Sequence, residues 1–160
     1  MDSWHEHGVT AAVLSPRGGI STGVLLSRGQ KALLIDCGDG VGRDLDDRGV
    51  TASSLSGVIV THDHGDHVGG LFGLFWWLRT KRRSEKLTIH GPRHAPTLRG
   101  IVALYRRVYR GRTRFAIRQR AMVHDRAFRA GPFEITSFPV RHRRSSSDPV
   151  GALMEVHALR

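Results

Sequence analysis

The feature that most constrains the fold is the seven-residue cluster THDHGDH at 61–67, which directly follows the apolar run Leu55–Val60. The run is short and apolar on both faces, which is typical of a strand buried in a sheet. Open α/β sheets bind their ligands in loops at the carboxyl ends of such strands. The sequence therefore predicts an α/β sheet with a functional loop at one edge.

Patterning on the N-terminal side of the cluster predicts a strand and a hairpin that ends in a central strand at Ala32–Ile35. The loop DCGDG at 36–40 follows this strand, and Val41–Asp47 has the composition of a short helix. We expect Cys37, within that loop, to be a small buried residue rather than a nucleophile. The sequence thus predicts that a second polar loop accompanies the histidine cluster.

Patterning on the C-terminal side predicts two helices and then more strands. The first helix should run from about Val68 to Thr80 and the second, which is amphipathic, over 95–110. The apolar faces of the two helices are predicted to consist of Leu71, Leu74, Phe75 and Leu78, and of Leu98, Ile101, Val102, Tyr105 and Val108. Strands are expected at KLTIHG (86–91), FAIRQ (115–119), AMVHD (121–125), RAFRA (126–130), PFEITSFPVRH (132–142) and VGALMEVHA (150–158). We expect Trp76 and Trp77 to be core or interface residues. Together these elements indicate one layered α/β domain over 1–160.

The positive charge of the chain is concentrated in its middle. Of 25 Lys and Arg residues, fourteen lie in 71–120, where Glu85 is the single acidic residue. A concentrated positive field attracts phosphate-rich partners, although arginines on solvated helix faces are an equally simple interpretation. The residues that could hold a phosphate backbone are Arg79, Arg82, Arg83, Arg106, Arg107, Arg110 and Arg112.

The remaining composition favours a cytoplasmic protein. The start MDSWHEHGVT lacks the basic and apolar regions of a secretory signal, and no stretch approaches the roughly 20 apolar residues that cross a bilayer. The single cysteine excludes an internal disulfide and fits a reducing compartment. We therefore expect no membrane partner.

The cluster has the chemistry of a divalent metal site. His62 and His64 are two residues apart, so in an extended backbone their side chains project to the same side and can bind one ion. Asp66 and His67 are adjacent and can face a second ion, as in two-metal sites whose ions are about 3.5–4 Å apart. Asp63 is expected to point away and to serve a local structural purpose.

The chain resembles the metallo-β-lactamase fold hydrolases, whose signature HxHxDH is matched by His62, His64, Asp66 and His67. The DCGDG loop is similar to the strand-end Asp-x-Gly segment of that family. Within the superfamily the chain is most similar to ribonuclease Z, through VTHDHGDHVGGL at 60–71, LTIHGP at 87–92 and FPVRH at 138–142. The resemblance implies an αββα sandwich, which we expect to be incomplete here, with roughly the first half and somewhat more.

Carried over residue by residue, the resemblance implies one zinc on His62, His64 and His142 and another on Asp66 and His67, with manganese as an alternative metal. Asp66 would also be the catalytic general base. The implied reaction is hydrolysis of a phosphodiester by metal-activated water, with RNA as the substrate and tRNA 3′ processing as the specific activity.

The family also has a bridging aspartate and a final histidine beyond the position of His142, and this sequence does not match them. We therefore expect a truncated domain, a weak second metal, and a homodimer that covers the exposed sheet face or completes the site. Other donors that could substitute are Asp148, His157, His124, His5 and His7. Two alternatives stay open, namely a small-molecule hydrolase acting on a lactone, thioester or cyclic nucleotide, and a catalytically impaired, metal-stabilised RNA-binding module.

Overall fold

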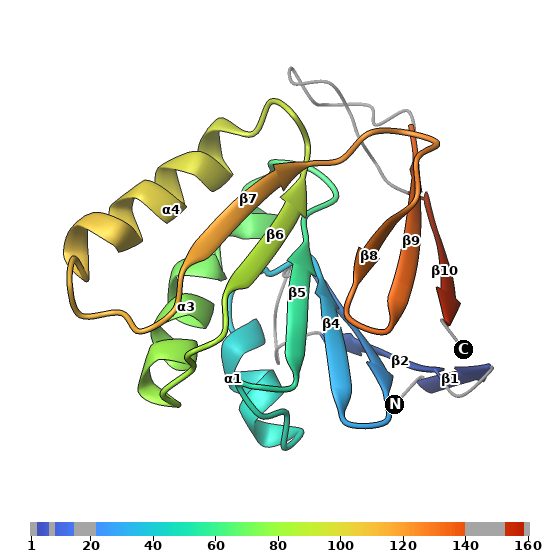
Figure 1. Cartoon of the computed structure of the whole chain (residues 1–160), viewed down its shortest axis with the longest axis horizontal. Coiled ribbons are helices and arrows are strands. Elements are labelled where there is room, and N and C mark those ends of the chain that lie inside the picture. The colour runs from blue at the N-terminus through green and yellow to red at the C-terminus, as the bar shows by residue number, and fades with distance from the viewer. Residues whose placement is uncertain (1–2, 7–8, 15–21, 140–152, 159–160) are drawn as a thin grey trace.

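The larger of two β-sheets begins as an antiparallel sheet and continues as a parallel one. The computed structural model describes residues 3–6, 9–14, 22–139 and 153–158 (Figure 1). The seven strands follow chain order, and β1 to β4 pair antiparallel while β4 to β7 pair parallel. Their bounds are β1 Ser3–Glu6, β2 Val9–Leu14, β3 Gly23–Arg28, β4 Lys31–Ile35, β5 Leu55–Ile59, β6 Leu87–Gly91 and β7 Ile117–Ala121.

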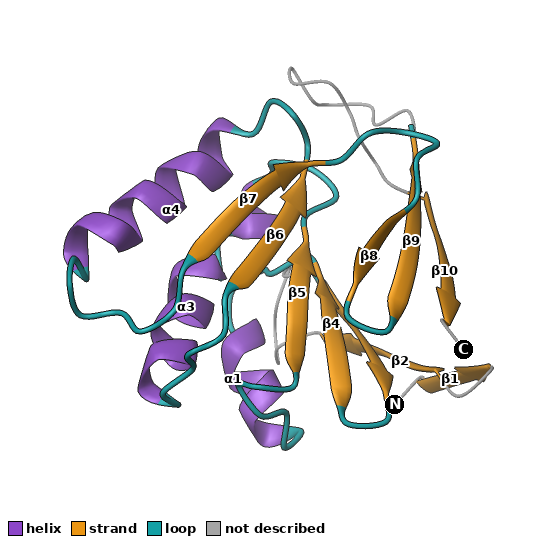
Figure 2. Cartoon of the chain, viewed as in Figure 1, coloured by secondary structure: helices purple, strands orange, loops and turns teal. Residues whose placement is uncertain are grey.

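Helices make the crossovers between the parallel strands. α1 (Val41–Asp47) joins β4 to β5, α2 (Gly65–Val68) and α3 (Leu71–Thr80) join β5 to β6, and α4 (Pro96–Val108) joins β6 to β7. Parallel strands are connected by right-handed crossovers, so a sheet that grows in one direction receives its helices on one face, as Figure 2 shows. The carboxyl ends of β4, β5 and β6 therefore lie at the same edge of the sheet.

A second, antiparallel sheet covers the other face. Its order is β10 (Leu153–Ala158), β9 (Phe133–Phe138) and β8 (Phe128–Ala130). Leu33 and Ile59 of the larger sheet are buried in one cluster with Phe133 and Ile135 of β9. The predicted layering of two sheets with helices outside the first is confirmed.

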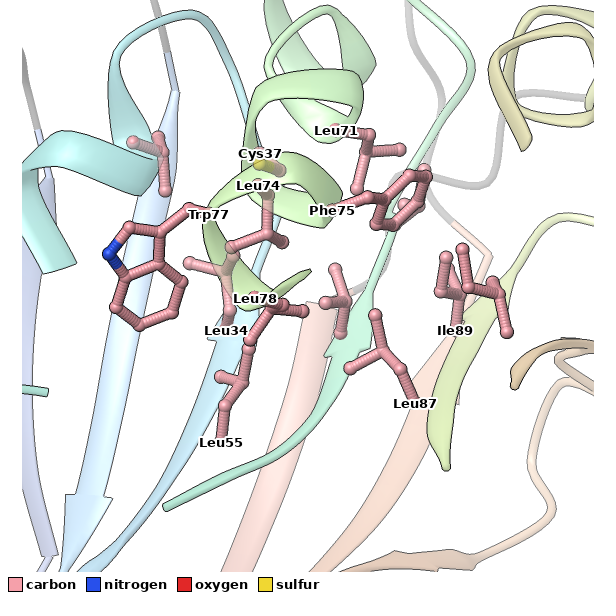
Figure 3. Close-up of a cluster of buried hydrophobic side chains, with 14 of the residues drawn as sticks. Leu34, Cys37, Leu55, Leu71, Leu74, Phe75, Trp77, Leu78, Leu87 and Ile89 are labelled. Carbon is pink, nitrogen blue, oxygen red and sulfur yellow. The ribbon is translucent and has the colours of Figure 1, made fainter. Parts of the chain in front are cut away.

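The helical face of the larger sheet is packed by alternate residues of the same strands. Leu34, which lies between two residues that face the second sheet, points toward the helices, and Figure 3 shows it beside Leu74. This explains why the sequence of β4 is apolar on both faces. The four apolar residues predicted for the first helix, Leu71, Leu74, Phe75 and Leu78, are all fully buried.

Three predictions about these elements were wrong in detail. The helix expected from Val68 to Thr80 is interrupted between α2 and α3, because the backbone N–H of Gly70 donates to the carbonyl of Cys37 rather than within a helix. AMVHD is not a separate strand, since β7 ends at Ala121 and a turn follows. Val108 is 49% exposed because the buried stripe of α4 continues through Tyr109, one position later.

The two adjacent tryptophans differ in their environment. Trp77 is buried in the core, as predicted, whereas Trp76 is 49% exposed because the following residue takes the inward position on α3. Within the described ranges, no helix is both long and apolar enough to cross a membrane.

Candidate metal site at the sheet edge

The histidine cluster and the loop after β4 are held against each other at the carboxyl edge of the sheet. The backbone N–H of Cys37 donates to the carbonyl of His67 at 2.7 Å, and the N–H of Gly70 donates to the carbonyl of Cys37 at 2.9 Å. A Cβ atom at position 70 would overlap the backbone carbonyl of Gly38. Glycine is therefore needed where the predicted long helix breaks, and the break brings the two loops together.

Asp36 organises the cluster from the neighbouring loop. It is buried, with 4% of its surface exposed, and its backbone is left-handed at φ 59°. Its Oδ1 accepts the backbone N–H of Thr61 at 2.8 Å, and its Oδ2 accepts the Thr61 hydroxyl at 2.7 Å. The same Oδ2 lies 2.8 Å from Nδ1 of His67. One carboxylate thus contacts both ends of the cluster.

These contacts determine which ring nitrogens carry hydrogen. Because Thr61 donates its hydroxyl hydrogen to Asp36, its oxygen accepts from Nδ1 of His62 at 3.0 Å. Nε2 of His62 is then the nitrogen with a lone pair, and the same reasoning leaves the lone pair of His67 on its Nε2. Orientation of metal-binding histidines by a carboxylate is a common arrangement in metal sites.

The first predicted ligand pair converges. Nε2 of His62 lies 3.0 Å from Nδ1 of His64, and the two rings meet edge to face with centroids 4.5 Å apart. Two nitrogens bound to one tetrahedral zinc at about 2.05 Å each would be about 3.3 Å apart. The observed separation is close to that value, and zinc binding would release the hydrogen that now lies between the two nitrogens.

The second predicted pair is also adjacent. Nε2 of His67 lies 3.4 Å from a carboxylate oxygen of Asp66, and the His67 ring packs on that of His62 with centroids 3.9 Å apart. Burial alone would lower the pKa of His67, but the hydrogen bond to Asp36 and the negative charges of Asp36 and Asp66 raise it. The Asp66 side chain is 43% exposed, so water can reach it.

The other predicted donors do not join this group in the described part of the chain. There, no set of three His, Cys, Asp or Glu side chains is arranged to hold a metal ion by itself. His142, the third ligand expected for the first zinc, lies outside the described residues, as do His7 and Asp148. His124 lies in the turn after β7, His5 in β1 and His157 in β10.

Asp63 has a structural role, as predicted, but its partners lie far away in the sequence and not locally. Its two carboxylate oxygens accept the backbone N–H groups of Thr97 at 2.7 Å and Leu98 at 2.8 Å, in the first turn of α4. The carboxylate also carries the charge that the N-terminus of a helix favours. The middle residue of the cluster therefore ties the candidate metal site to α4.

The structure alters the predicted set of phosphate-binding arginines in two ways. Arg83 is buried, and its guanidinium donates to the backbone carbonyls of Ala52, Glu85 and Lys86, so it cannot hold a phosphate backbone. The other arginines lie toward the ends of α3 and α4 that are remote from the cluster.

Sequence reasoning missed two residues of the site, Asp36 and Thr61. The signal for Asp36 was present, since an Asp-x-Gly segment directly follows a buried strand. Thr61 had no signal of its own, because a hydroxyl between an apolar run and a histidine becomes informative only when its partner is known.

The sequence of the chain is similar to a described protein family and to ribonuclease Z. A family model described as "Anti-Pycsar protein Apyc1" matches residues 7–158. Ribonuclease Z of Bradyrhizobium diazoefficiens is 35% identical over 125 residues, which are 78% of this chain and 41% of that protein. The chain thus spans about two fifths of the length of this relative.

Solved structures resemble the chain at the level of the fold. The metallo-β-lactamase fold protein YhfI from Bacillus subtilis aligns with a TM-score of 0.63 at 22% identity, over 85% of this chain and 55% of that chain. The short form of human tRNase Z aligns with a TM-score of 0.64 at 20% identity, over 84% of this chain and 61% of that chain. These neighbours confirm the predicted metallo-β-lactamase fold.

Proposed function

The chain belongs to the family of the anti-Pycsar protein Apyc1, and on that premise we propose that it is a metal-dependent phosphodiesterase of the metallo-β-lactamase fold, with RNA as its leading substrate class. The observation that carries the proposal is the convergence of His62 Nε2 and His64 Nδ1 at 3.0 Å. Similarity to ribonuclease Z supports phosphodiester chemistry, and the excess of arginine supports a polyanionic substrate.

The ligand assignment is the one that the HxHxDH signature implies. His62 and His64 would hold one zinc ion together with His142, and Asp66 with His67 would contribute to a second. When bound, zinc or manganese polarises a phosphoryl oxygen and lowers the pKa of water.

The protein's own groups orient the ligands and move the proton. Asp36 holds the His67 ring directly and the His62 ring through Thr61, so neither ring has to reorient during the reaction. Asp66 is exposed enough to meet the attacking water, and its carboxylate is the group proposed to take the proton.

The test is zinc content together with hydrolysis of bis(p-nitrophenyl) phosphate. His64→Ala removes one of the two converging nitrogens and should reduce both zinc content and hydrolysis by at least tenfold. Asp47→Asn is the control, because Asp47 is exposed at the C-terminal end of α1, away from the cluster. Equal hydrolysis by His64→Ala and the unaltered chain would contradict the proposal.

A compact phosphodiester such as a cyclic nucleotide is the second candidate substrate. Its support is that the family model matching residues 7–158 is not that of ribonuclease Z, of whose length the chain spans only 41%. Parallel assays with single-stranded RNA, a cyclic nucleotide, a lactone and a thioester separate the two candidates and the other hydrolases of this fold. Preference for the lactone or thioester would contradict both.

A homodimer stays a prediction. Its support is the exposure of large apolar side chains on the outer surface of α3 and α4, namely Trp76, Leu104 and Val108. Light scattering is the measurement, and a monomer at micromolar concentration would contradict the prediction.

A further inference from the structure

The excess of positive charge has a definite place in the fold. Arg110, Arg112 and Arg114 lie in the loop between α4 and β7, Arg106 and Arg107 lie in the last turn of α4, and all five are exposed. Within the described ranges none of them has an ion-pair partner, since the lysine and arginine pairs found there involve Lys81 and Arg129. Cations in the last turn complement the helix dipole, but this does not account for the three in the loop.

A pocket of about 310 Å³ opens among these residues. Arg106, Arg110 and Thr113 line it together with the half-buried Tyr109, and with Tyr105 and Phe115, whose side chains are buried in the core. Its volume is at the lower end of the range for small-ligand sites. Of the three rings, Tyr109 is the one exposed enough to meet a base, and an aromatic ring beside arginines is a combination that single-stranded nucleic-acid sites use, because a base stacks on the ring while cations bind the phosphates.

Two guanidinium groups are already fixed in place, one on Arg106, which lines the pocket, and one on Arg79, which contacts the pocket residue Tyr109. Arg106 donates to the carbonyl of Ile117 at 2.5 Å, and Arg79 donates through Nε to the carbonyl of Arg112 at 3.1 Å. The Arg79 guanidinium also lies over the Tyr109 ring, 4.9 Å from its centroid. Because carbonyls rather than carboxylates accept these hydrogen bonds, the positive charge of both groups stays uncompensated. Since the two side chains are already held, they would lose little conformational entropy when a ligand binds.

The pocket is separate from the candidate metal site. The cluster contacts the first turn of α4 through Asp63, whereas the pocket lies at the last turn. α4 has 13 residues, so its two ends are about 20 Å apart at 1.5 Å per residue. Figure 1 shows α4 running away from the carboxyl ends of β5 and β6.

We propose that the last turn of α4 and the loop at 109–116 form a binding site for single-stranded RNA, with phosphates on the exposed arginines and one base in the pocket beside Tyr109. The site would hold an RNA strand at the end of α4 opposite the candidate metal site, and α4 is about 20 Å long. This inference rests on the proposed phosphodiester chemistry for the choice of RNA as ligand.

The test measures the affinity of a fluorescently labelled 12-nucleotide RNA as a function of salt, by fluorescence anisotropy. Arg110→Glu combined with Arg112→Glu should weaken binding at least tenfold. The slope of log affinity against log salt should become shallower by about 1.4, because each phosphate contact of a single strand contributes about 0.7. Circular dichroism checks that the variant is folded.

The control combines Arg43→Glu with Arg126→Glu, which changes the net charge equally at two exposed arginines that lie outside both the last turn of α4 and the loop at 109–116. We expect it to weaken binding less than threefold, and an effect as large as that of the pocket variant would overturn the proposal. Inorganic polyphosphate with the same number of phosphates should bind at least tenfold more weakly than the RNA. Equal affinity would overturn the role of the base and with it the assignment to RNA.

Binding is measured in the His64→Ala variant as well as in the unaltered chain, so that it is read without hydrolysis. If hydrolysis fails in every assay while RNA affinity still follows the pocket arginines, the proposed function is wrong and this inference stands. If hydrolysis succeeds and the pocket variant binds RNA normally, this inference alone is wrong.

Discussion

Replacing Asp36 with asparagine is the most informative single perturbation of the site. The substitution keeps the size of the side chain, and asparagine tolerates the left-handed backbone at φ 59°. It can still accept the backbone N–H of Thr61 through one oxygen. An amide NH₂ at the other position cannot accept from the Thr61 hydroxyl or from His67 Nδ1, so two of the three hydrogen bonds are lost.

The expected effects have different sizes for stability and for metal binding. Hydrogen bonds to a charged group contribute about 1.5–3 kcal/mol each, and the two share one oxygen, so we expect the free energy of unfolding to fall by about 2–4 kcal/mol. Loss of the carboxylate that orients metal ligands typically weakens metal affinity about 10- to 100-fold. Zinc affinity should therefore fall within that range although no proposed ligand has changed.

Urea denaturation of the metal-free protein and calorimetric titration with zinc measure the two effects. Asp47→Asn removes one carboxylate from an exposed position and should change neither quantity appreciably. Zinc affinity in Asp36→Asn equal to that of the unaltered chain would refute the argument that this carboxylate orients His62 and His67.

Three further predictions follow from individual contacts. Gly70→Ala should force the backbone away from the Gly38 carbonyl and so separate the two site loops. We expect a lower melting temperature by circular dichroism and a lower zinc affinity by titration, and unchanged values would contradict this role of Gly70. Asp63→Ala should reduce the free energy of unfolding by about 1 kcal/mol by removing the cap of α4, and an unchanged urea midpoint would contradict the cap. Burial, and then the charge of Arg120, lower the pKa of His90 from 6.5 to about 4, so the unfolded chain binds more protons below pH 6.5. Stability should therefore fall by roughly 2 kcal/mol between pH 6.5 and 4 and less in His90→Phe, and parallel pH profiles for the two proteins would contradict it.

The sheet could be predicted from sequence because its strands are short apolar runs bounded by turns. The strand predicted at Leu55–Val60 and the helix predicted at Val41–Asp47 agree with the observed β5 and α1 to within one residue at each end. Their limits depend on local signals, namely an apolar period and a terminating glycine. The helix expected from Val68 to Thr80 could not be corrected in the same way. Its break at Gly70 depends on contact with a loop about thirty residues earlier in the chain.

The proximity of the predicted donors could be expected from the sequence, but the groups that hold them in place could not. Spacing alone brings His62 and His64 to the same side of an extended segment, and the structure places their nitrogens 3.0 Å apart. The role of Asp36 depends on the parallel pairing of β4 with β5, and this pairing cannot be predicted from local sequence patterns. Arg83 was misassigned for a related reason, because its carbonyl partners include Ala52, far away in the sequence.

The most direct test of the central claim is anomalous diffraction at the zinc edge from crystals grown with zinc. We expect a peak within bonding distance of both His62 Nε2 and His64 Nδ1. Zinc bound elsewhere in the crystal, with no peak between these two nitrogens, would contradict it.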